Sequence, residues 1–297
     1  MDRPQTAKKL SILRKYFGVW LTIWSGDKCR SWVAKRWYVL DLFAGTGESY
    51  GAEGGTISGS PLVFLELIEA NASRLRDNGI AITLMLREQD GPSCQALEGR
   101  VNAYMESHPG IADLVDIDVR CEDCNVAATQ FASSAKVTSN TPAFLFVDPF
   151  GLAIQRAAVD ALVSLPWAID VLFNYMLDGI RRVFGAASGS STWAHADAAK
   201  LAEYFGKDIV INSMAQIEDP KTYARAAFGA HGLRTVAFYM RWPSKEAMQY
   251  VLLFACKNPR VVDIMREIYA KEMSDQYGQG SLFGLEEHLT HIEIIEP

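Results

Sequence analysis

The sequence lacks an apolar run long enough to cross a membrane, because a spanning helix needs about 20 consecutive apolar residues. No uninterrupted apolar run in the 297 residues approaches that length. Positive charge is also in the minority, since the formal net charge is −6. An acidic chain does not bind polyanions through its bulk charge, so any contact with nucleic acid requires a local basic patch. We therefore expect no membrane-spanning segment and no non-specific affinity for nucleic acid.

One candidate for a local basic patch is the N-terminal segment. Apolar residues recur there at helical spacing and leave a basic opposite face. A solvated helix face is an equally good interpretation of the same pattern. The basic residues are Lys8, Lys9, Arg14, Lys15, Lys28, Arg30, Lys35 and Arg36.

Cysteine is scarce and odd in number. The five cysteines are Cys29, Cys94, Cys121, Cys124 and Cys256. With no visible signal peptide, we expect reduced thiols in a cytoplasmic protein. Cys121 and Cys124 have Cys-x-x-Cys spacing, but zinc would need two further ligands and no second pair exists. A redox pair is the other alternative, and buried, unreactive thiols are the expected state, with no metal.

Strand-like and helix-like segments alternate along the chain. The hydrophobic content of 49% suffices for a sizeable core. The predicted strands are 37–42, 80–86, 114–119, 143–147 and 169–173, and the predicted helices are 60–76, 93–106 and 157–165. Two further strands in "LRTVAFYMRW" and "YVLLFACKN" precede a last helix. The pattern predicts an α/β, Rossmann-like fold, with a mostly parallel seven-stranded sheet and helices on both faces.

The domain organisation follows from the same reading. Residues 1–36 form an N-terminal helical segment, and 37–297 form one domain with a helical insertion at about 178–230. We expect Ser60 to cap a helix with Pro61 in its first turn. "GESYGAEGGTISGS" and the tail "SDQYGQGSLFGL" are rich in glycine and serine, and both are predicted loops.

Polar side chains follow all five central strands. The segments are "DLFAGTG", "REQD", "CEDCN", "DPFG" and "FNYM", so four strand ends carry a carboxylate and the fifth an asparagine. Ligands of parallel sheets bind outside the carboxyl ends of the strands. Each acid could instead simply cap a turn or helix. Four acids in this order favour a ligand site over four separate caps.

The glycine turn after Asp41 excludes some ligands. A triphosphate loop would need Gly-Lys-Ser/Thr, which is absent. A dinucleotide site would need an acid about 20 residues after the turn, whereas Glu88 follows Gly47 by about forty. S-adenosylmethionine fits better, because Asp41 can balance its positive amino-acid end. Glu88 can accept from both ribose hydroxyls and Asp123 from the adenine amine.

These motifs resemble the class I methyltransferase fold and, more narrowly, the three-Cys-motif partner family of bacteria and phages. The matching segments are "KKLSILRKYFGVWL", "YVLDLFAGTG", "GSPL", "VDPFGL", "FNYMLDGIRR" and "YVLLFACKNPRVVDIMREIY". The resemblance implies S-adenosylmethionine as cofactor, held by Asp41, Phe43, Ala44, Gly45, Gly47, Glu88 and Asp123. It also implies a separate three-cysteine, radical-type partner protein, while the substrate of the family is poorly defined. The chain departs from the family in placing Arg87 before Glu88 and two cysteines around Asp123.

The "DPFG" turn is the candidate catalytic motif. It resembles the Asp/Asn-Pro-Pro-aromatic turn of methyltransferases that act on base amines, with the second proline missing. Asp148 and the Pro149 carbonyl would accept from the target amine while Phe150 stacks on the base. A simple strand-terminating turn is an equal alternative. Asn174, Arg181 and Arg182 would form a substrate-binding wall, although ion pairs at the surface explain the arginines equally well.

The function predicted from these motifs is methyl transfer from S-adenosylmethionine to an amine of a nucleic-acid base or nucleotide, in DNA or RNA. One alternative is a non-catalytic partner subunit that binds the cofactor or nucleic acid within a modification or phage-related system. Another is a nucleotide-binding reductase.

Overall fold

The computed structural model describes residues 4–50, 55–187, 194–209, 213–242, 245–274 and 292–297. Its main feature is an eight-stranded sheet in the order β10-β8-β9-β7-β6-β1-β4-β5. The strands are β1 (Arg36–Asp41), β4 (Ala81–Glu88), β5 (Val115–Cys121), β6 (Pro142–Val147), β7 (Ala168–Tyr175), β8 (Arg234–Trp242), β9 (Lys245–Cys256) and β10 (Ile292–Ile295). Pairing is parallel from β5 to β7, whereas β9 is antiparallel to both β7 and β8.

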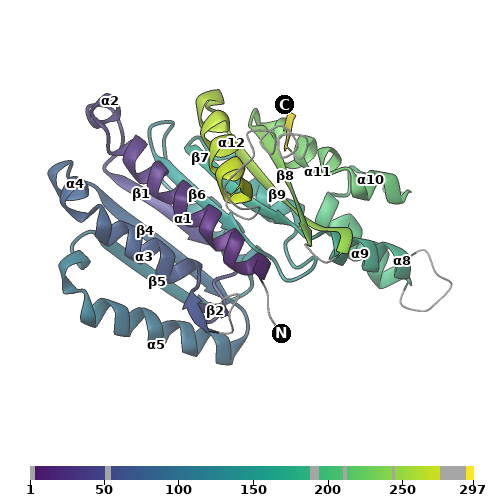
Figure 1. Cartoon of the computed structure of the whole chain (residues 1–297), viewed down its shortest axis with the longest axis horizontal. Helices are drawn as coiled ribbons and strands as arrows, with labels where there is room; N and C mark the ends of the chain where they lie inside the picture. The colour runs from purple at the N-terminus through teal and green to yellow at the C-terminus, as the bar shows by residue number, and fades with distance from the viewer. Residues whose placement is uncertain (1–3, 51–54, 188–193, 210–212, 243–244, 275–291) are drawn as a thin grey trace.

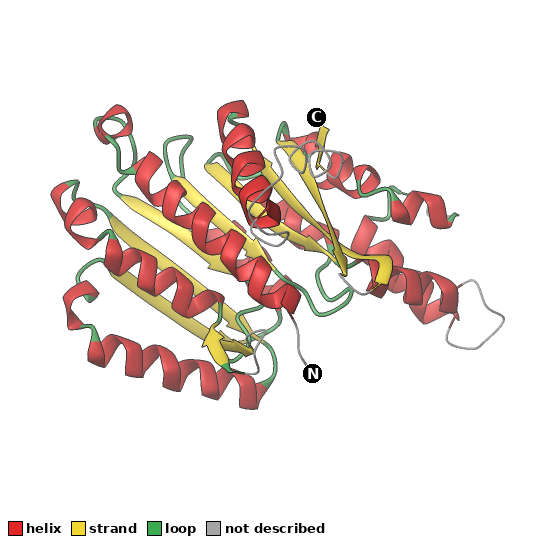
Figure 2. Ribbon diagram, viewed as in Figure 1, coloured by secondary structure: helices red, strands yellow, loops and turns green. Residues whose placement is uncertain are grey.

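Helices cover both faces of this sheet (Figure 2). On one face lie α1 (Pro4–Trp24), α3 (Ser60–Ala70), α5 (Gly91–Ser107) and α12 (Pro259–Ser274) (Figure 1). On the other lie α6 (Cys124–Ser134), α7 (Arg156–Val163), α8 (Leu177–Ala187), α9 (Ala194–Phe205), α10 (Met214–Glu218) and α11 (Lys221–Ala227). Two short helices, α2 (Asp27–Arg30) and α4 (Ala72–Asp77), lie at the ends of longer elements.

Each face of the sheet has its own hydrophobic core, because the side chains of a strand alternate between the two faces. Neighbouring residues of a strand point to opposite faces of a sheet. Val39 of β1 is therefore buried with Phe17 and Phe64 on the face of α1 and α3. Leu40, the next residue, is buried with Leu162 on the face of α7. Central strands buried on both sides explain why the strand segments are nearly continuous apolar runs.

The α/β class, the mostly parallel sheet and the helices on both faces are confirmed, but the predicted strand number is wrong. The sheet has eight strands because Ile292–Ile295 pairs antiparallel with β8 at the edge. So short a segment carries little periodicity, and its pairing with β8 makes it a strand. The predicted tail loop, after Ser274, falls outside the described residues.

Several local predictions also need correction. Part of the predicted loop after Gly47 forms a two-stranded hairpin of β2 (Glu48–Tyr50) and β3 (Thr56–Ser58). Gly59, not Ser60, is the N-cap of α3, and Pro61 lies in the first turn as expected. The predicted helix over 60–76 is interrupted at Asn71, where α3 ends and α4 begins.

The first helix packs on the sheet. Its apolar residues, among them Phe17 and Trp20, are buried in the core shared with α3 and α12. Between β7 and β8, where we expected a helical insertion, the described residues form α8 to α11. Tyr204 of α9 and Tyr223 of α11 are fully buried there.

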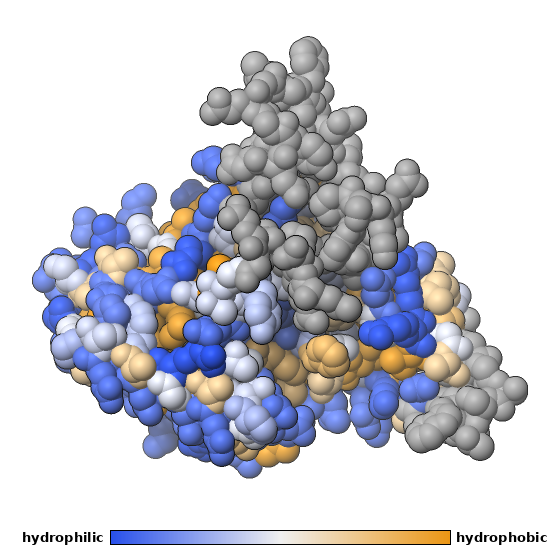
Figure 3. Space-filling view, turned by 60° about the horizontal axis from the view of Figure 1, so that its bottom comes forward, coloured by the Kyte–Doolittle hydropathy of each residue, from blue (hydrophilic) through white to orange (hydrophobic). Residues whose placement is uncertain are grey.

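The surface is mixed in character. The coloured part of Figure 3 shows hydrophobic and hydrophilic residues interleaved over the face that it presents. None of the described helices combines the length and the apolarity that a membrane crossing requires.

Gly59→Ala should destabilise the protein, because a Cβ at this position would lie 2.8 Å from the backbone C and O of Gly47. Overpacking of this kind costs about 1–3 kcal/mol of the free energy of unfolding. Gly99→Ala is the matched control, since nothing lies within 4 Å of its Cβ position and alanine favours a helix. Urea titrations of both variants measure the effect. Equal stability of Gly59→Ala and wild type would contradict the close approach.

Candidate functional site

The glycine turn follows β1 at the carboxyl edge of the sheet. Gly45 and Gly47 adopt φ angles of +59° and +80°, which only glycine adopts readily. The Ala44 amide donates to the Arg87 carbonyl at 2.8 Å, which ties the turn to the end of β4. The turn is thus fixed between β1 and β4, and its backbone faces the region beyond the strand ends.

Asp41 ends β1 and is fully buried. Its Oδ1 accepts from the Phe43 amide at 3.2 Å. Its Oδ2 is buried and has no hydrogen-bond partner of standard geometry among the described residues. Burial raises the pKa of Asp41 to about 7, and the Ser60 hydroxyl and the Phe43 amide offset only part of that effect. A positive group near Asp41 would therefore favour its ionised form.

Glu88 connects β4 to the glycine turn. Its Oε2 accepts from the Gly45 amide at 3.0 Å, and its Oε1 accepts from the Asp90 amide at 2.8 Å. Each carboxylate oxygen has two acceptor positions, so both can still accept from a ligand hydroxyl. Glu88 therefore fixes the loop conformation and remains able to bind a diol.

Asp148 lies at the centre of a polar cluster. Its Oδ1 accepts from Asn174 Nδ2 at 2.7 Å. Its Oδ2 forms an ion pair with Lys9, whose side chain reaches it from α1. Asn174 Nδ2 also lies 3.1 Å from the Met176 sulfur, and Asn174 Oδ1 is buried without a partner among the described residues. The predicted catalytic and substrate residues Asp148 and Asn174 are thus brought together.

A pocket of about 380 Å³ opens at this edge. That volume lies within the range typical of small-molecule sites. Its lining residues are Leu42, Phe43, Gly45, Glu88, Gln89, Glu122, Cys124, Asp148, Phe150 and Ala153. The structure thus brings Phe43, Gly45 and Glu88 together with Asp148 and Phe150, as the motifs predict. Phe150 is 89% exposed at the pocket, which is unusual for a large aromatic side chain.

Other predicted site residues do not line the pocket. Asp41, Ala44, Gly47, Pro149 and Asn174 are buried. Asp123 is the N-cap of α6 and accepts from the amides of Asn125 and Val126. That arrangement is the capping role that we held as the alternative for each acid. Adenine recognition by Asp123 stays a prediction.

Arg181 and Arg182 lie on α8 and do not line the pocket. Arg181 donates to Glu218 at 2.7 Å and forms an ion pair with Asp178. Arg182 donates to the Asp178 carbonyl at 3.4 Å. These are the surface interactions that we considered as the alternative to phosphate binding.

Among the residues that the motifs missed are three with long polar or charged side chains, Gln89, Glu122 and Lys9. Gln89 and Glu122 each follow a strand end, so the rule that identified Glu88 and Asp123 would also have indicated them. Glu122 Oε1 lies 2.6 Å from Arg87 Nε, although without hydrogen-bond alignment. No pattern in the sequence around Lys9 indicates that it contacts Asp148. Lys9 was assigned to a basic surface, yet it is 8% exposed.

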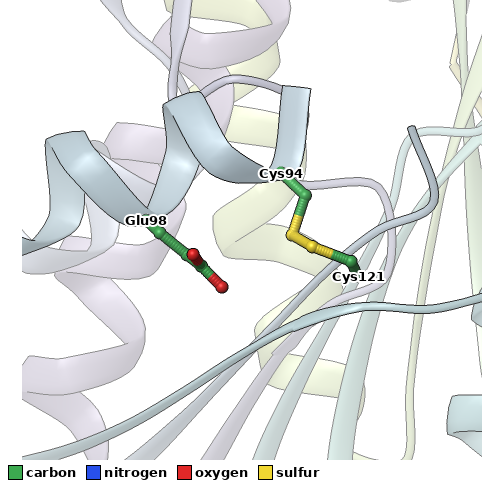
Figure 4. Close-up of side chains that lie close together, drawn as sticks. All are labelled: Cys94, Glu98 and Cys121. Carbon is green, nitrogen blue, oxygen red and sulfur yellow. A yellow bond between two sulfur atoms is a disulfide. The ribbon is translucent and has the colours of Figure 1, made fainter. Parts of the chain in front are cut away.

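The expectation of reduced thiols is wrong for two cysteines. Cys94 and Cys121 form a disulfide (Figure 4). Cys94 lies in the first turn of α5 and Cys121 ends β5, so the packing of helix and strand brings their Cα atoms within 5.6 Å. Cys29, Cys124 and Cys256 are free. Cys121 therefore does not act with Cys124, its neighbour in the Cys-x-x-Cys spacing.

The disulfide also bears on metal binding. Glu98 lies one turn of α5 beyond Cys94, and its carboxylate and both sulfur atoms lie within 4.8 Å of one another (Figure 4). Sulfur binds zinc as a thiolate. Two sulfurs bonded to each other do not offer that ligand, so this cluster is not a zinc site in the oxidised protein.

The fold and the site together define an α/β protein with a pocket at the carboxyl edge of a mostly parallel sheet. No family model matches the chain, and no curated protein matches it either. One solved structure similar to it is that of protein LPL1258 from Legionella pneumophila str. Philadelphia 1, described by the family model DUF519. The two are 13% identical, the match covers 99% of this chain and 97% of that one, and the TM-score is 0.48. So distant a likeness bears on neither ligand nor activity.

Lys9→Met should destabilise the protein by about 2–3 kcal/mol, because it leaves the Asp148 carboxylate without its positive partner. Arg14→Met is the matched control in the same helix. Arg14 pairs with Glu66 at the surface, where such pairs contribute about 0–1 kcal/mol. In denaturant titrations, Lys9→Met/Asp148→Asn should recover part of the loss. Equal effects of Lys9→Met and Arg14→Met would show that the ion pair is not a structural element.

The disulfide predicts a defined thiol count. Alkylation of the denatured protein should modify three cysteines without reductant and five after reduction. Since Cys121 follows Cys94 at a sequence separation of 27, Cys94→Ser should lower the free energy of unfolding by about 3–4 kcal/mol. Cys29→Ser, which removes a free thiol, is the control. Five modified cysteines before reduction would contradict the bond.

Proposed function

We propose that this protein is an S-adenosylmethionine-dependent methyltransferase that acts on an amine of a nucleic-acid base or nucleotide. One observation carries the proposal. A single pocket is lined by the glycine turn and Glu88, which suit the cofactor, and by Asp148 and Phe150, which suit the substrate. The resemblance to class I methyltransferases implied the cofactor residues and the substrate residues from separate motifs. That both groups line one pocket supports the two assignments.

The sheet supports the same proposal. If the edge strand β10 is left aside, the sheet formed by the described residues has seven strands. Of these, only β9 is antiparallel to the others. That is the mostly parallel, seven-stranded arrangement that the resemblance implies. The chain passes from β1 to β4 and β5 on one side, then to β6 and β7 on the other. The strand order therefore reverses between β1 and β6, where such folds bind ligands.

The charge of the pocket favours this cofactor over a dinucleotide. Its charged lining residues are Glu88, Glu122 and Asp148, and no basic residue of the described part of the chain lines it. Asp148 pairs with Lys9 and Glu122 lies beside Arg87, whereas Glu88 has no ion pair among the described residues. The Glu88 carboxylate repels a pyrophosphate and attracts a cation. S-adenosylmethionine carries a sulfonium and an ammonium group, and when bound it supplies an electrophilic methyl group. The residues present fit that molecule, with Glu88 as acceptor for the ribose hydroxyls.

Asp148 and its partners would position the target amine. Lys9 pairs with Oδ2 of the carboxylate, and Asn174 Nδ2 donates to Oδ1, so the two contacts fix its orientation. An ionised, oriented carboxylate accepts more strongly from an amine as positive charge develops on nitrogen. The exposed ring of Phe150 is available to stack on the base.

The ion pair of Lys9 and Asp148 also favours a second function. Both carboxylate oxygens already have a partner within the protein. A cofactor- or nucleic-acid-binding subunit without catalysis, in a modification or phage-related system, would use Asp148 only to hold α1 on the sheet. Activity measurements distinguish the two functions.

The proposal is tested by binding and transfer measured together. S-adenosylhomocysteine should bind the wild type, and Glu88→Gln should weaken binding at least tenfold, or about 1.4 kcal/mol. With labelled S-adenosylmethionine and pooled DNA, RNA and nucleotides, Asp148→Asn should lose transfer yet retain cofactor affinity. Phe150→Ala should weaken substrate binding by about 1–3 kcal/mol.

Tyr50→Leu is the control, because Tyr50 is an exposed aromatic residue of β2 that does not line the pocket. Cofactor binding without transfer by the wild type would support the non-catalytic subunit. No binding of S-adenosylhomocysteine by the folded wild type would refute the cofactor assignment.

A further inference from the structure

A second, larger cavity lies at the amino ends of the parallel strands, at the opposite end from the candidate site. Its volume is about 540 Å³, and none of the described residues lines both this cavity and the candidate site. It is bordered by the end of α1, the segment after α2 and the beginnings of β7 and α12. In Figure 1, α2 and β2 mark the opposite ends of the strands. The cavity therefore lies away from the five motifs that follow the carboxyl ends of the strands.

Indole rings form much of the cavity wall. Four tryptophans of the described residues line it, namely Trp20, Trp24, Trp32 and Trp167. The rings of Trp24 and Trp32 meet at 73° with centroids 6.0 Å apart, so they form two walls close to a right angle. Trp32 is 47% exposed, an unusual position for so large an apolar side chain. Indole faces attract cations more strongly than other aromatic rings do.

The wall also contains a buried carboxyl group. Asp170 of β7 lines the cavity and is 6% exposed. Its Oδ2 accepts from the Tyr16 hydroxyl at 2.6 Å, and no lysine, arginine or histidine of the described residues forms an ion pair with it. Burial raises the pKa of Asp170 to about 7. Burying a carboxyl without a positive partner is costly, and a bound cation would supply that partner.

A second polar group in the wall lacks a partner. Trp20 Nε1 is buried and has no acceptor among the described residues. Buried donors are usually satisfied. By contrast, the indole of Trp167 donates to the Leu162 carbonyl at 2.9 Å and that of Trp32 to the Lys28 carbonyl at 2.8 Å.

Charge decides which ligands suit the cavity. Lys257 also lines it, but its side chain is exposed, so water and salt screen it. Asp170 is buried and screened much less. An organic anion would be repelled by the inner wall, and a neutral molecule would leave Asp170 unpaired.

We propose that this cavity binds a small organic monocation, an ammonium group carried on an aromatic or other apolar body. The ammonium group would lie near Asp170 and the indole faces, and the apolar body would pack against the corner that Trp24 and Trp32 form. The site is separate from the candidate methyl-transfer pocket and does not depend on the function proposed for it.

The test compares three benzyl compounds of different charge by calorimetry. Benzyltrimethylammonium should bind at least tenfold more tightly than benzyl alcohol or phenylacetate. Asp170→Asn keeps an acceptor for Tyr16 and removes the charge, so it should weaken binding of the cation at least tenfold and leave benzyl alcohol nearly unchanged. Trp32→Leu should weaken the cation several-fold, whereas Tyr50→Leu, an exposed aromatic position outside the cavity, should not.

Equal affinities for the cation and benzyl alcohol would overturn the proposal, as would no binding of the cation at millimolar concentration. An unchanged affinity in folded Asp170→Asn would also overturn it. Circular dichroism establishes the folding of each variant. If Asp170→Asn does not fold, Trp32→Leu decides the question, because its half-exposed side chain can be replaced without opening the core. Binding of S-adenosylhomocysteine at the other pocket is a separate measurement, so failure of either proposal is recognised independently.

Discussion

The pairing of β1 with β4 on one side and β6 on the other fixes the positions of the other elements. Asp41 lies in register with Leu86 of β4 and Phe146 of β6. Because all three strands are parallel, their following loops leave the sheet at one edge. The glycine turn, Glu88 and the "DPFG" turn are adjacent for this reason, although about a hundred residues separate the first from the last.

The acids at this edge have different roles. Asp123 satisfies amides at the start of α6, and Glu88 satisfies two amides of neighbouring loops. Asp41 is buried, with one oxygen that has no hydrogen-bond partner among the described residues, and Asp148 is paired with Lys9. A carboxylate at a strand end therefore contributes first to loop structure. Only the acceptor positions that remain, chiefly on Glu88 and Asp148, are available to a ligand in the pocket.

The two cavities differ in construction. The pocket at the carboxyl edge is formed by loops and is acidic, with Phe150 exposed beside it. The cavity at the amino edge is formed by α1 and the strand beginnings, with indole rings around one buried carboxyl group. Helix α1 contributes to both edges. Lys9 reaches Asp148 from its first half, and Trp20 and Trp24 border the second cavity from its last turns.

The sequence by itself determined the α/β class, the five central strands and the residues that end them. These features depend on apolar runs, turn glycines and chain order, which are local. Tertiary structure alone decided that Lys9 pairs with Asp148, 139 residues away, and that Cys94 bonds with Cys121. It also made Ile292–Ile295 an eighth strand and brought four tryptophans and Asp170 into the wall of one cavity. Such contacts depend on where a helix packs across a sheet. The spacing of side chains along one segment indicates which face is buried, but not which other segment packs against that face.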